Sequence, residues 1–205
     1  MEKELHVSIS PGNAKMGAIP SVSLPPIKSC SLAACELCGK KCYVRRIIAR
    51  RKTVRDAYER NWFLLSNDPD KFWREISAAV AMTTHFRFGV SGDIPTTDYL
   101  EHIVKIARTY KHCEILCFTK QYDIVNEYLK HHRLPKNLHL IFSAWKGLKM
   151  NNPYNLPEAH VLFRDGTTTA KDGAKWCSGN CSVCGIENKN CWSLQKGEQI
   201  VFKEH

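Results

Sequence analysis

Residues 113–145, CEILCFTKQYDIVNEYLKHHRLPKNLHLIFSAW, alternate between two kinds of hydrophobic pattern. Residues 113–118 and 137–143 are short and almost continuously apolar, which is typical of buried strands. Residues 122–132, between them, carry apolar side chains at helical spacing. A strand, a helix and a second strand in this order predict a βαβ unit with parallel strands and a right-handed crossover.

The same pattern extends in both directions from this unit. Apolar runs at 86–91 and 159–163 predict two further strands, and 97–110 predicts an amphipathic helix. Upstream, we expect short extended segments within 5–27, one unbroken helix over 43–65 and another over 69–82, which Asn67-Asp68-Pro69 would separate. Strands that alternate with helices indicate an α/β fold. We therefore predict a complete or partial (β/α) TIM-like barrel, with a flat doubly wound sheet as the second choice.

Composition limits the class of protein. The chain has 205 residues, of which 43% are hydrophobic, and 30 Lys and Arg against 20 Asp and Glu give a net charge of +10. The hydrophobic content excludes general disorder. No run approaches the roughly 20 apolar residues that cross a bilayer, so we expect no membrane partner. The first ten residues lack the pattern of a signal peptide, which predicts a cytoplasmic protein.

The length predicts a single domain over residues 1–205. We divide it into extended segments and a Cys-rich group at 1–42, a βα core at 43–165 and a Cys-rich segment at 166–205. The Cys-rich loops therefore lie at both ends of the chain.

Eight of the ten cysteines fall into two short windows. The first Cys group is Cys30, Cys35, Cys38 and Cys42, and the second Cys group is Cys177, Cys181, Cys184 and Cys191. Close thiols in a reducing compartment are better explained as metal ligands than as disulfides. The remaining Cys113 and Cys117 lie in an apolar strand, and we expect both in the core.

The spacing within each group bears on the metal. Cys177, Cys181 and Cys184 form C-x3-C-x2-C, with Cys191 further on. Several close cysteines from one loop plus one more suit a 4Fe–4S cluster, and the second Cys group is the first choice for it. The first Cys group would hold another metal or share a ligand. Four thiolates also suit structural zinc, which stays the alternative.

Polar side chains follow three of the predicted strands. Both candidate architectures place working residues at the carboxyl ends of their strands. Asp93 and Lys120 are the candidate catalytic residues, because a charge directly after a strand faces the site. Ser91, Thr119 and Ser143 are candidate cofactor-binding residues at the same ends. A small-molecule substrate would bind there.

Segment 40–60, KKCYVRRIIARRKTVRDAYER, is strongly basic. It holds nine Lys and Arg and two acids, and therefore contributes +7 of the net +10. Such a helix could bind nucleic acid, because each phosphate that it neutralises releases counterions. A solvated basic face is the simpler alternative, and no RNA-recognition or helix-turn-helix signature accompanies the segment.

The sequence resembles the phage family of gene product 88-like proteins over nearly its whole length. The residues that carry the resemblance are SPGNAKMGAIPSVSLPP at 10–26, CY at 42–43, SGD at 91–93, FTK at 118–120, LPKN at 134–137, CSGNC at 177–181 and CW at 191–192. The order of these motifs is also similar to that of reduced radical S-adenosylmethionine proteins. This second resemblance implies a partial (β/α) barrel with a 4Fe–4S cluster, in the host cytoplasm if a phage encodes the chain.

Two departures weaken the implied radical chemistry. Radical S-adenosylmethionine enzymes carry C-x3-C-x2-C after the first strand, whereas here that spacing begins at Cys177, and the spacing from Cys35 to Cys42 is reversed. A fourth ligand from Cys191 would also fill the iron position that S-adenosylmethionine needs. We therefore predict an iron–sulfur protein that acts as a redox or radical S-adenosylmethionine-like enzyme. The alternative is a zinc-stabilised, non-enzymatic protein that binds nucleic acid.

Overall fold

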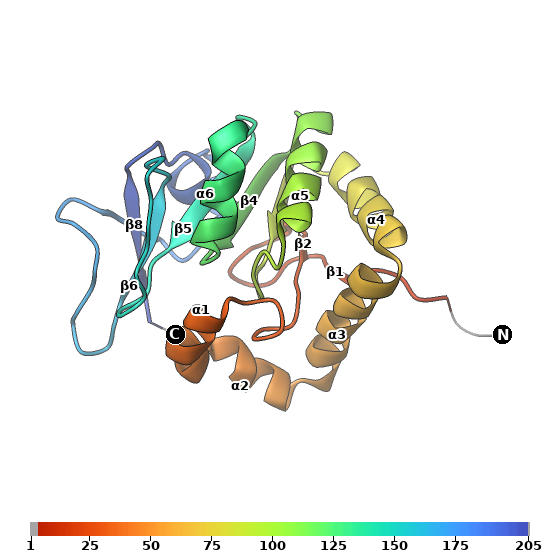
Figure 1. The fold of residues 1–205 in the computed structure, drawn as a ribbon, viewed down its shortest axis with the longest axis horizontal. Helices are drawn as coiled ribbons and strands as arrows, with labels where there is room; N and C mark the ends of the chain where they lie inside the picture. Colours follow the sequence, from red (N-terminus) through yellow and green to blue (C-terminus); the bar gives the residue numbers. More distant parts are fainter. Residues whose placement is uncertain (1–3, 205) are drawn as a thin grey trace.

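A computed structural model describes residues 4–204, whose strands form one open sheet in the order β1-β2-β3-β4-β5-β6-β8-β7 (Figure 1). β1 is antiparallel to β2, and all other neighbours are parallel. The parallel strands therefore end at one edge, here called the carboxyl edge. The strands are β1 (Ile9–Ser10), β2 (Ser21–Val22), β3 (His85–Phe88), β4 (Glu114–Thr119), β5 (Leu138–Ser143), β6 (Glu158–Leu162), β7 (Lys175–Trp176) and β8 (Gln199–Lys203).

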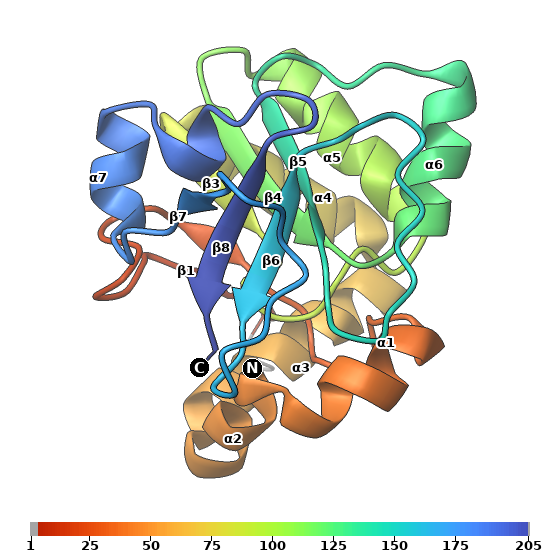
Figure 2. The ribbon, with the colours of Figure 1, turned by 90° about the vertical axis from the view of Figure 1, so that its left-hand side faces the viewer.

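Three helices cover one face of the sheet, here called the helix face: α4 (Pro69–Ala81), α5 (Thr97–Thr109) and α6 (Tyr122–His131) (Figures 1 and 2). They confirm the helices predicted from periodicity, to within one residue at each end. The Asp68 side chain accepts a hydrogen bond from the N–H of Lys71 and so caps α4. Thr96 caps α5 in the same way. Phe86 and Phe88 of β3 are fully buried against these helices.

A second apolar core lies on the opposite face. Because side chains alternate along a strand, Leu116 and Ile141 point away from the helices and pack with Trp192, Cys184 and Cys191 from the end of the chain. The elements that carry this cover are α7 (Cys181–Ile186) and the 3₁₀ helix η2 (Asn190–Trp192). The sheet is thus buried on both faces by different parts of the sequence.

The sheet of residues 4–204 does not close, so the predicted barrel is wrong in its complete form and is replaced by an open α/β sheet. A barrel repeats a helix after each strand. Here residues 144–157 run from β5 to β6 without a helix, and the edge strands β1 and β7 have two residues each. The C-terminal Cys-rich segment occupies the face that the far wall of a barrel would cover.

The helix predicted over 43–65 is interrupted. The structure forms α2 (Tyr43–Arg50) and α3 (Lys52–Asn67), with Arg51 in an extended conformation between them. The break lets α3 pack against α4 while α2 lies along the carboxyl edge (Figure 1). No Gly or Pro marks Arg51 as a break, so local sequence could not reveal it. The helix α1 (Leu32–Leu37) and the 3₁₀ helix η1 (Cys38–Lys41) precede α2. No helix within residues 4–204 has the length and apolar character to cross a bilayer.

Candidate functional site

The carboxyl edge brings together the polar residues predicted there. Asp93, after β3, is buried, and its carboxylate accepts three hydrogen bonds. The Thr119 hydroxyl donates to Oδ1 at 2.5 Å, the Lys120 N–H donates to Oδ2 at 2.9 Å, and the Ile94 N–H donates to Oδ1 at 2.8 Å. Asp93 therefore ties the end of β4 to the loop after β3. Burial raises the pKa of its carboxyl, and the bonds from Thr119 and Lys120 oppose that shift.

Lys120 extends from the end of β4 across the edge to β5. Its Nζ donates a hydrogen bond to the Ser143 hydroxyl at 2.9 Å. The Tyr122 hydroxyl donates to the Ser143 carbonyl at 2.6 Å. The ammonium group also lies 5.9 Å from the centre of the Trp145 ring. Lys120 and Ser143 thus form a polar pair across the edge, while Asp93 fixes the main chain of Lys120.

Ser91 joins the strand end to the N-terminal segment. Its hydroxyl donates to the Leu24 carbonyl at 2.9 Å, and its N–H donates to the Ser23 hydroxyl at 3.2 Å. Gly92 has a φ of 78°, and an added Cβ would lie 2.4 Å from Ser29 Oγ. Glycine is therefore required where the loop after β3 passes the segment that leads into the first Cys group.

The first Cys group lies beside this polar pair. Cys30 precedes α1, Cys35 is within it, Cys38 begins η1, and Cys42 is the N-cap residue of α2. Burial and the neighbouring carboxylate of Asp93 raise the pKa of Cys30 to about 12. Burial also raises the pKa of Cys38, which nearby Lys120 opposes. The predicted candidate catalytic residues and the first Cys group therefore belong to one site.

The second Cys group lies elsewhere, on the face opposite the helices. Cys177 follows β7, Cys181 and Cys184 belong to α7, and Cys191 to η2. The pKa of Cys191 is raised to about 12 by burial and by the other three thiols of its group. Figure 2 shows α7 and α1 at opposite corners of the molecule, so the two groups do not share a centre.

Polar groups surround the sulfurs of the second Cys group. Asn190 Nδ2 donates to Cys184 Sγ at 3.2 Å, and the Gly179 N–H donates to Cys177 Sγ at 3.4 Å. Hydrogen bonds to sulfur stabilise thiolate ligands and adjust the potential of a cluster. All ten cysteines of the chain are free thiols, so neither group is locked in a disulfide.

Arg87 of β3 points to the same face as the second Cys group. Its guanidinium lies 5.0 Å from the centre of the Phe118 ring, and its positive charge opposes the rise in pKa of Cys181 and Cys191. Its Nε is buried and has no hydrogen-bond partner within residues 4–204. A cation beside two of the thiols, with its Nε buried and without a partner, fits an anionic occupant, because a metal centre with four thiolates carries negative charge.

The thiols do not form a closed site for a single ion. As the side chains stand, no three His, Cys, Asp or Glu residues among the described residues are arranged to hold a metal ion. A 4Fe–4S cluster binds its four thiolates at four different irons, so its ligands surround a larger body than one ion. Four free thiols with hydrogen bonds to two of the sulfurs are a donor set that could hold such a cluster.

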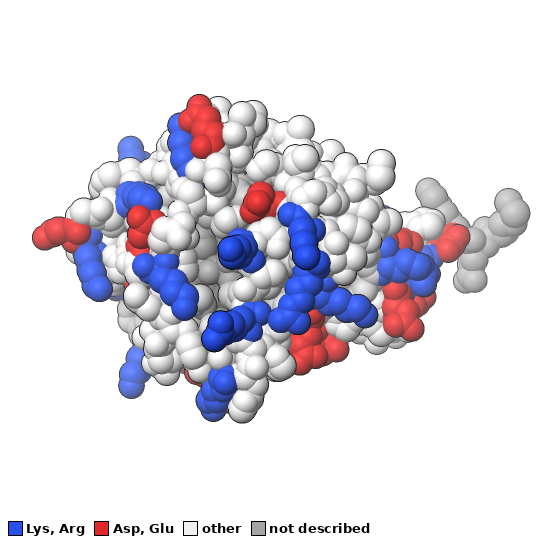
Figure 3. All heavy atoms as spheres, turned by 90° about the horizontal axis from the view of Figure 1, so that it is seen from above, with Lys and Arg blue, Asp and Glu red and all other residues white. Residues whose placement is uncertain are grey.

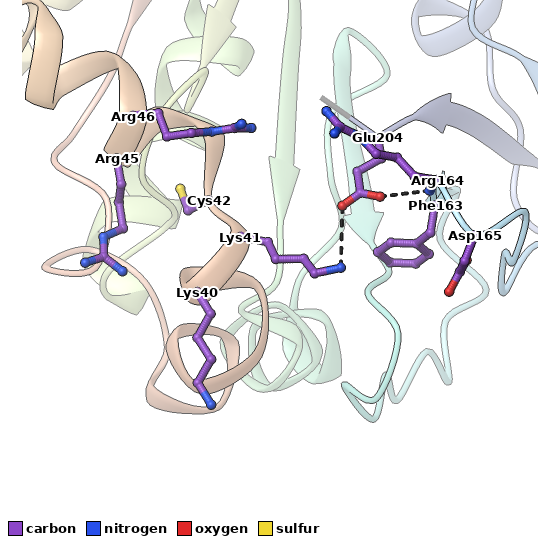
Figure 4. A pocket seen from close by; sticks show the side chains of 9 residues that line it. All are labelled: Lys40, Lys41, Cys42, Arg45, Arg46, Phe163, Arg164, Asp165 and Glu204. Atoms are coloured by element: carbon purple, nitrogen blue, oxygen red, sulfur yellow. Dashed lines mark hydrogen bonds and ion pairs between the residues drawn. The ribbon is translucent and has the colours of Figure 1, made fainter.

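A cleft of about 750 Å³ opens at the carboxyl edge, next to the first Cys group (Figure 4). Sequence reasoning identified its basic half, at 40–46, but missed the half that follows β6 and β8. The loop after β6 carried no recognisable signal, because its residues become part of a site only through folding. The lining residues are Lys40, Lys41, Cys42, Arg45, Arg46, Phe163, Arg164, Asp165 and Glu204.

Fold and site together define an α/β protein with an open, largely parallel sheet, a polar site at its carboxyl edge and two separate groups of four thiols. The profile of the family described as Gene product 88 matches residues 3–198. The chain belongs to this family, which confirms the resemblance to phage gene product 88-like proteins. No curated protein and no solved structure matches the chain.

Proposed function

We propose that this chain is an iron–sulfur protein whose second Cys group holds a 4Fe–4S cluster. The observation that carries the proposal is the buried Nε of Arg87, which lies near Cys181 and Cys191 and has no hydrogen-bond partner among the described residues. A buried donor without a partner is costly, and an anionic cluster in that place would compensate it. Four thiolates leave no open iron position, so this centre would transfer electrons rather than bind a substrate.

The first Cys group would then be the reactive centre. It lies beside Lys120 and follows β2, the first parallel strand, as the cluster loop of radical S-adenosylmethionine proteins does. A metal or cluster bound there would supply redox or Lewis-acid chemistry. Lys120 and Ser143 would bind and orient a polar small-molecule substrate, with Thr119 and Ser91 holding the edge in place. Asp93 would act as a positioning residue through the main chain of Lys120.

The test is metal and sulfide content of protein purified without oxygen. We expect roughly four irons and four sulfides in the second Cys group and a brown charge-transfer band. The double variant Cys184→Ser/Cys191→Ser should lose this cluster, whereas the matched variant Cys38→Ser/Cys42→Ser should keep it. Cys113→Ala removes a buried thiol outside both groups and should change neither metal nor sulfide.

Three results would decide against the proposal. Stoichiometric zinc without sulfide would favour the alternative, a zinc-stabilised, non-enzymatic protein that binds nucleic acid through segment 40–60. Wild-type protein without bound metal after anaerobic reconstitution with iron and sulfide would refute both kinds of centre. If only Cys38→Ser/Cys42→Ser loses the cluster, the assignment of the two groups is reversed.

A further inference from the structure

The cleft is built from two segments that are distant in sequence. Figure 4 shows the side chains from η1 and the start of α2 on one side and those after β6 and β8 on the other. Lys41 reaches across, and its Nζ lies 3.6 Å from Glu204 Oε1. The volume of about 750 Å³ is within the range of ligand pockets, roughly 300–1,000 Å³. The cleft can therefore hold a ligand of nucleotide size.

The cleft carries an excess of positive charge. Its lining holds five cationic and two acidic side chains, which gives a net charge of +3. The acids are already engaged: Glu204 Oε2 accepts the Arg164 N–H at 2.9 Å, and Asp165 accepts two hydrogen bonds from Thr167. The bonds from Thr167 lower the pKa of Asp165 to about 2, so this carboxylate stays ionised and hydrogen-bonded to Thr167. The acids cannot neutralise all the cations.

The position of two arginines adds to this imbalance. Arg45 and Arg46 lie in the first turn of α2, which contains no acidic residue and has no side-chain cap. The positive end of the helix dipole disfavours cations there and favours anions. A bound anion would relieve both the repulsion among the side chains and the conflict with the helix dipole.

The type of cation indicates the type of anion. Three of the five cations, Arg45, Arg46 and Arg164, are arginines, and they come from both walls of the cleft. The planar guanidinium donates paired hydrogen bonds that match phosphate oxygens, and guanidiniums on two walls suit a ligand with more than one phosphate. Arg45 also donates from Nη1 to the Gly39 carbonyl at 3.2 Å. We infer that the cleft binds the phosphate groups of a nucleotide, either free or as part of a nucleic-acid strand.

The cleft adjoins the proposed reactive centre. Cys42 lines the cleft and belongs to the first Cys group. The ammonium of Lys41 lies 5.7 Å from the centre of the Phe163 ring, which packs edge-on against Trp145, and Lys120 lies over Trp145. The rings of Phe163 and Trp145 therefore lie between the cleft and Lys120. Phosphate binding in the cleft requires no particular metal in either Cys group.

The cleft also differs from the rest of the basic surface. Figure 3 shows the end of the molecule opposite α2, where Lys and Arg side chains gather over the middle of the surface with acidic side chains among them. Lys105, Lys111 and Lys136 are exposed residues on α5 and in loops. None of these three lysines lines the cleft. Replacing them removes the same charge from the protein without changing the cleft, so they provide a matched control.

The experiment compares two triple variants with the same loss of charge. Lys40→Gln/Arg45→Gln/Arg164→Gln removes three cations from the cleft, and Lys105→Gln/Lys111→Gln/Lys136→Gln is the control. Fluorescence anisotropy measures the binding of a labelled oligothymidylate of 20 nucleotides and of labelled ATP, at salt concentrations from 50 to 300 mM. Circular dichroism and metal content show whether each variant keeps the fold and the metal.

We expect the cleft variant to bind at least tenfold more weakly than wild type, and the control to stay within about twofold. For the oligonucleotide, we plot the logarithm of the binding constant against the logarithm of the salt concentration. The magnitude of the slope should fall by roughly 2, because each of the three removed cations loses one single-strand phosphate contact and each contact contributes about 0.7. Binding of ATP alone identifies a free nucleotide, and binding of the oligonucleotide identifies a nucleic-acid strand. Equal losses in both variants, or no binding of either probe at 50 mM salt, would overturn the inference.

Discussion

Replacing Thr119 tests whether the Asp93 network determines the structure of the carboxyl edge. The Thr119 side chain is 1% exposed, donates to Asp93 Oδ1 at 2.5 Å and accepts the Gln121 N–H at 2.9 Å. Thr119→Val keeps the shape and removes both bonds. Thr119→Ser keeps the hydroxyl and removes one methyl group.

The expected losses differ because a bond to a charged group is the stronger one. A hydrogen bond to a carboxylate contributes roughly 1.5–3 kcal/mol, and a buried N–H without a partner costs roughly 1–3 kcal/mol. Gln121 is half-buried at the start of α6, so in Thr119→Val the cost of leaving its N–H without a partner lies at the lower end of that range. Thr119→Val should therefore lower the free energy of unfolding by about 3 kcal/mol. Thr119→Ser should lower it by about 1 kcal/mol, the contribution of a buried methyl group.

Urea unfolding followed by circular dichroism measures the difference. With a slope of roughly 2 kcal/mol per molar urea, the midpoint should fall by about 1.5 M in Thr119→Val and about 0.5 M in Thr119→Ser. Equal midpoints in the two variants would refute the reasoning, because the hydroxyl would then contribute nothing to the network around Asp93.

Three further predictions follow from other parts of the molecule. Asn137 donates to three main-chain carbonyls at the end of α5 and the start of β4, so Asn137→Ala should destabilise the protein by about 3 kcal/mol in the same urea assay. Trp192 is 1% exposed beside the second Cys group, so Trp192→Ala should cost about 4 kcal/mol and speed alkylation of those thiols. Burial acts to raise the pKa of Glu158, but hydrogen bonds from its polar neighbours lower it below 4.5. The stability that Glu158 contributes is present above pH 4.5 and is lost as the pH falls, so Glu158→Gln should reduce the loss of stability on acidification from pH of about 5 to about 3.

The βαβ core could be predicted because local physical chemistry determines it. The apolar runs that became β4 and β5 are too short for helices, and the helical period of α5 and α6 is strong. Parallel strands joined by helices must also end at one edge. The meeting of Asp93, Thr119, Lys120 and Ser143 there follows from the order of strands alone.

The predictions from sequence were wrong where contacts between distant residues outweigh the local preference for helix or strand. The sequence predicts a single helix over 43–65, but packing of α3 on α4 requires the break at Arg51. Closure of a barrel depends on whether helices follow β5 and β6, and the loops there carry no periodic signal. The charge of Arg87 within an apolar strand was a visible anomaly, and its place beside the second Cys group needed the fold.

The sequence by itself determined the α/β class, the parallel core, the division of the cysteines into two groups and the residues of the carboxyl edge. These depend on hydrophobic period and on spacing along the chain, which act over a few residues. Only the tertiary structure decided that the sheet stays open, that the two Cys groups lie apart, that the first adjoins Lys120 and that Arg164 completes the cleft. These features join residues that are distant in the sequence, and packing brings such residues together without leaving a local pattern.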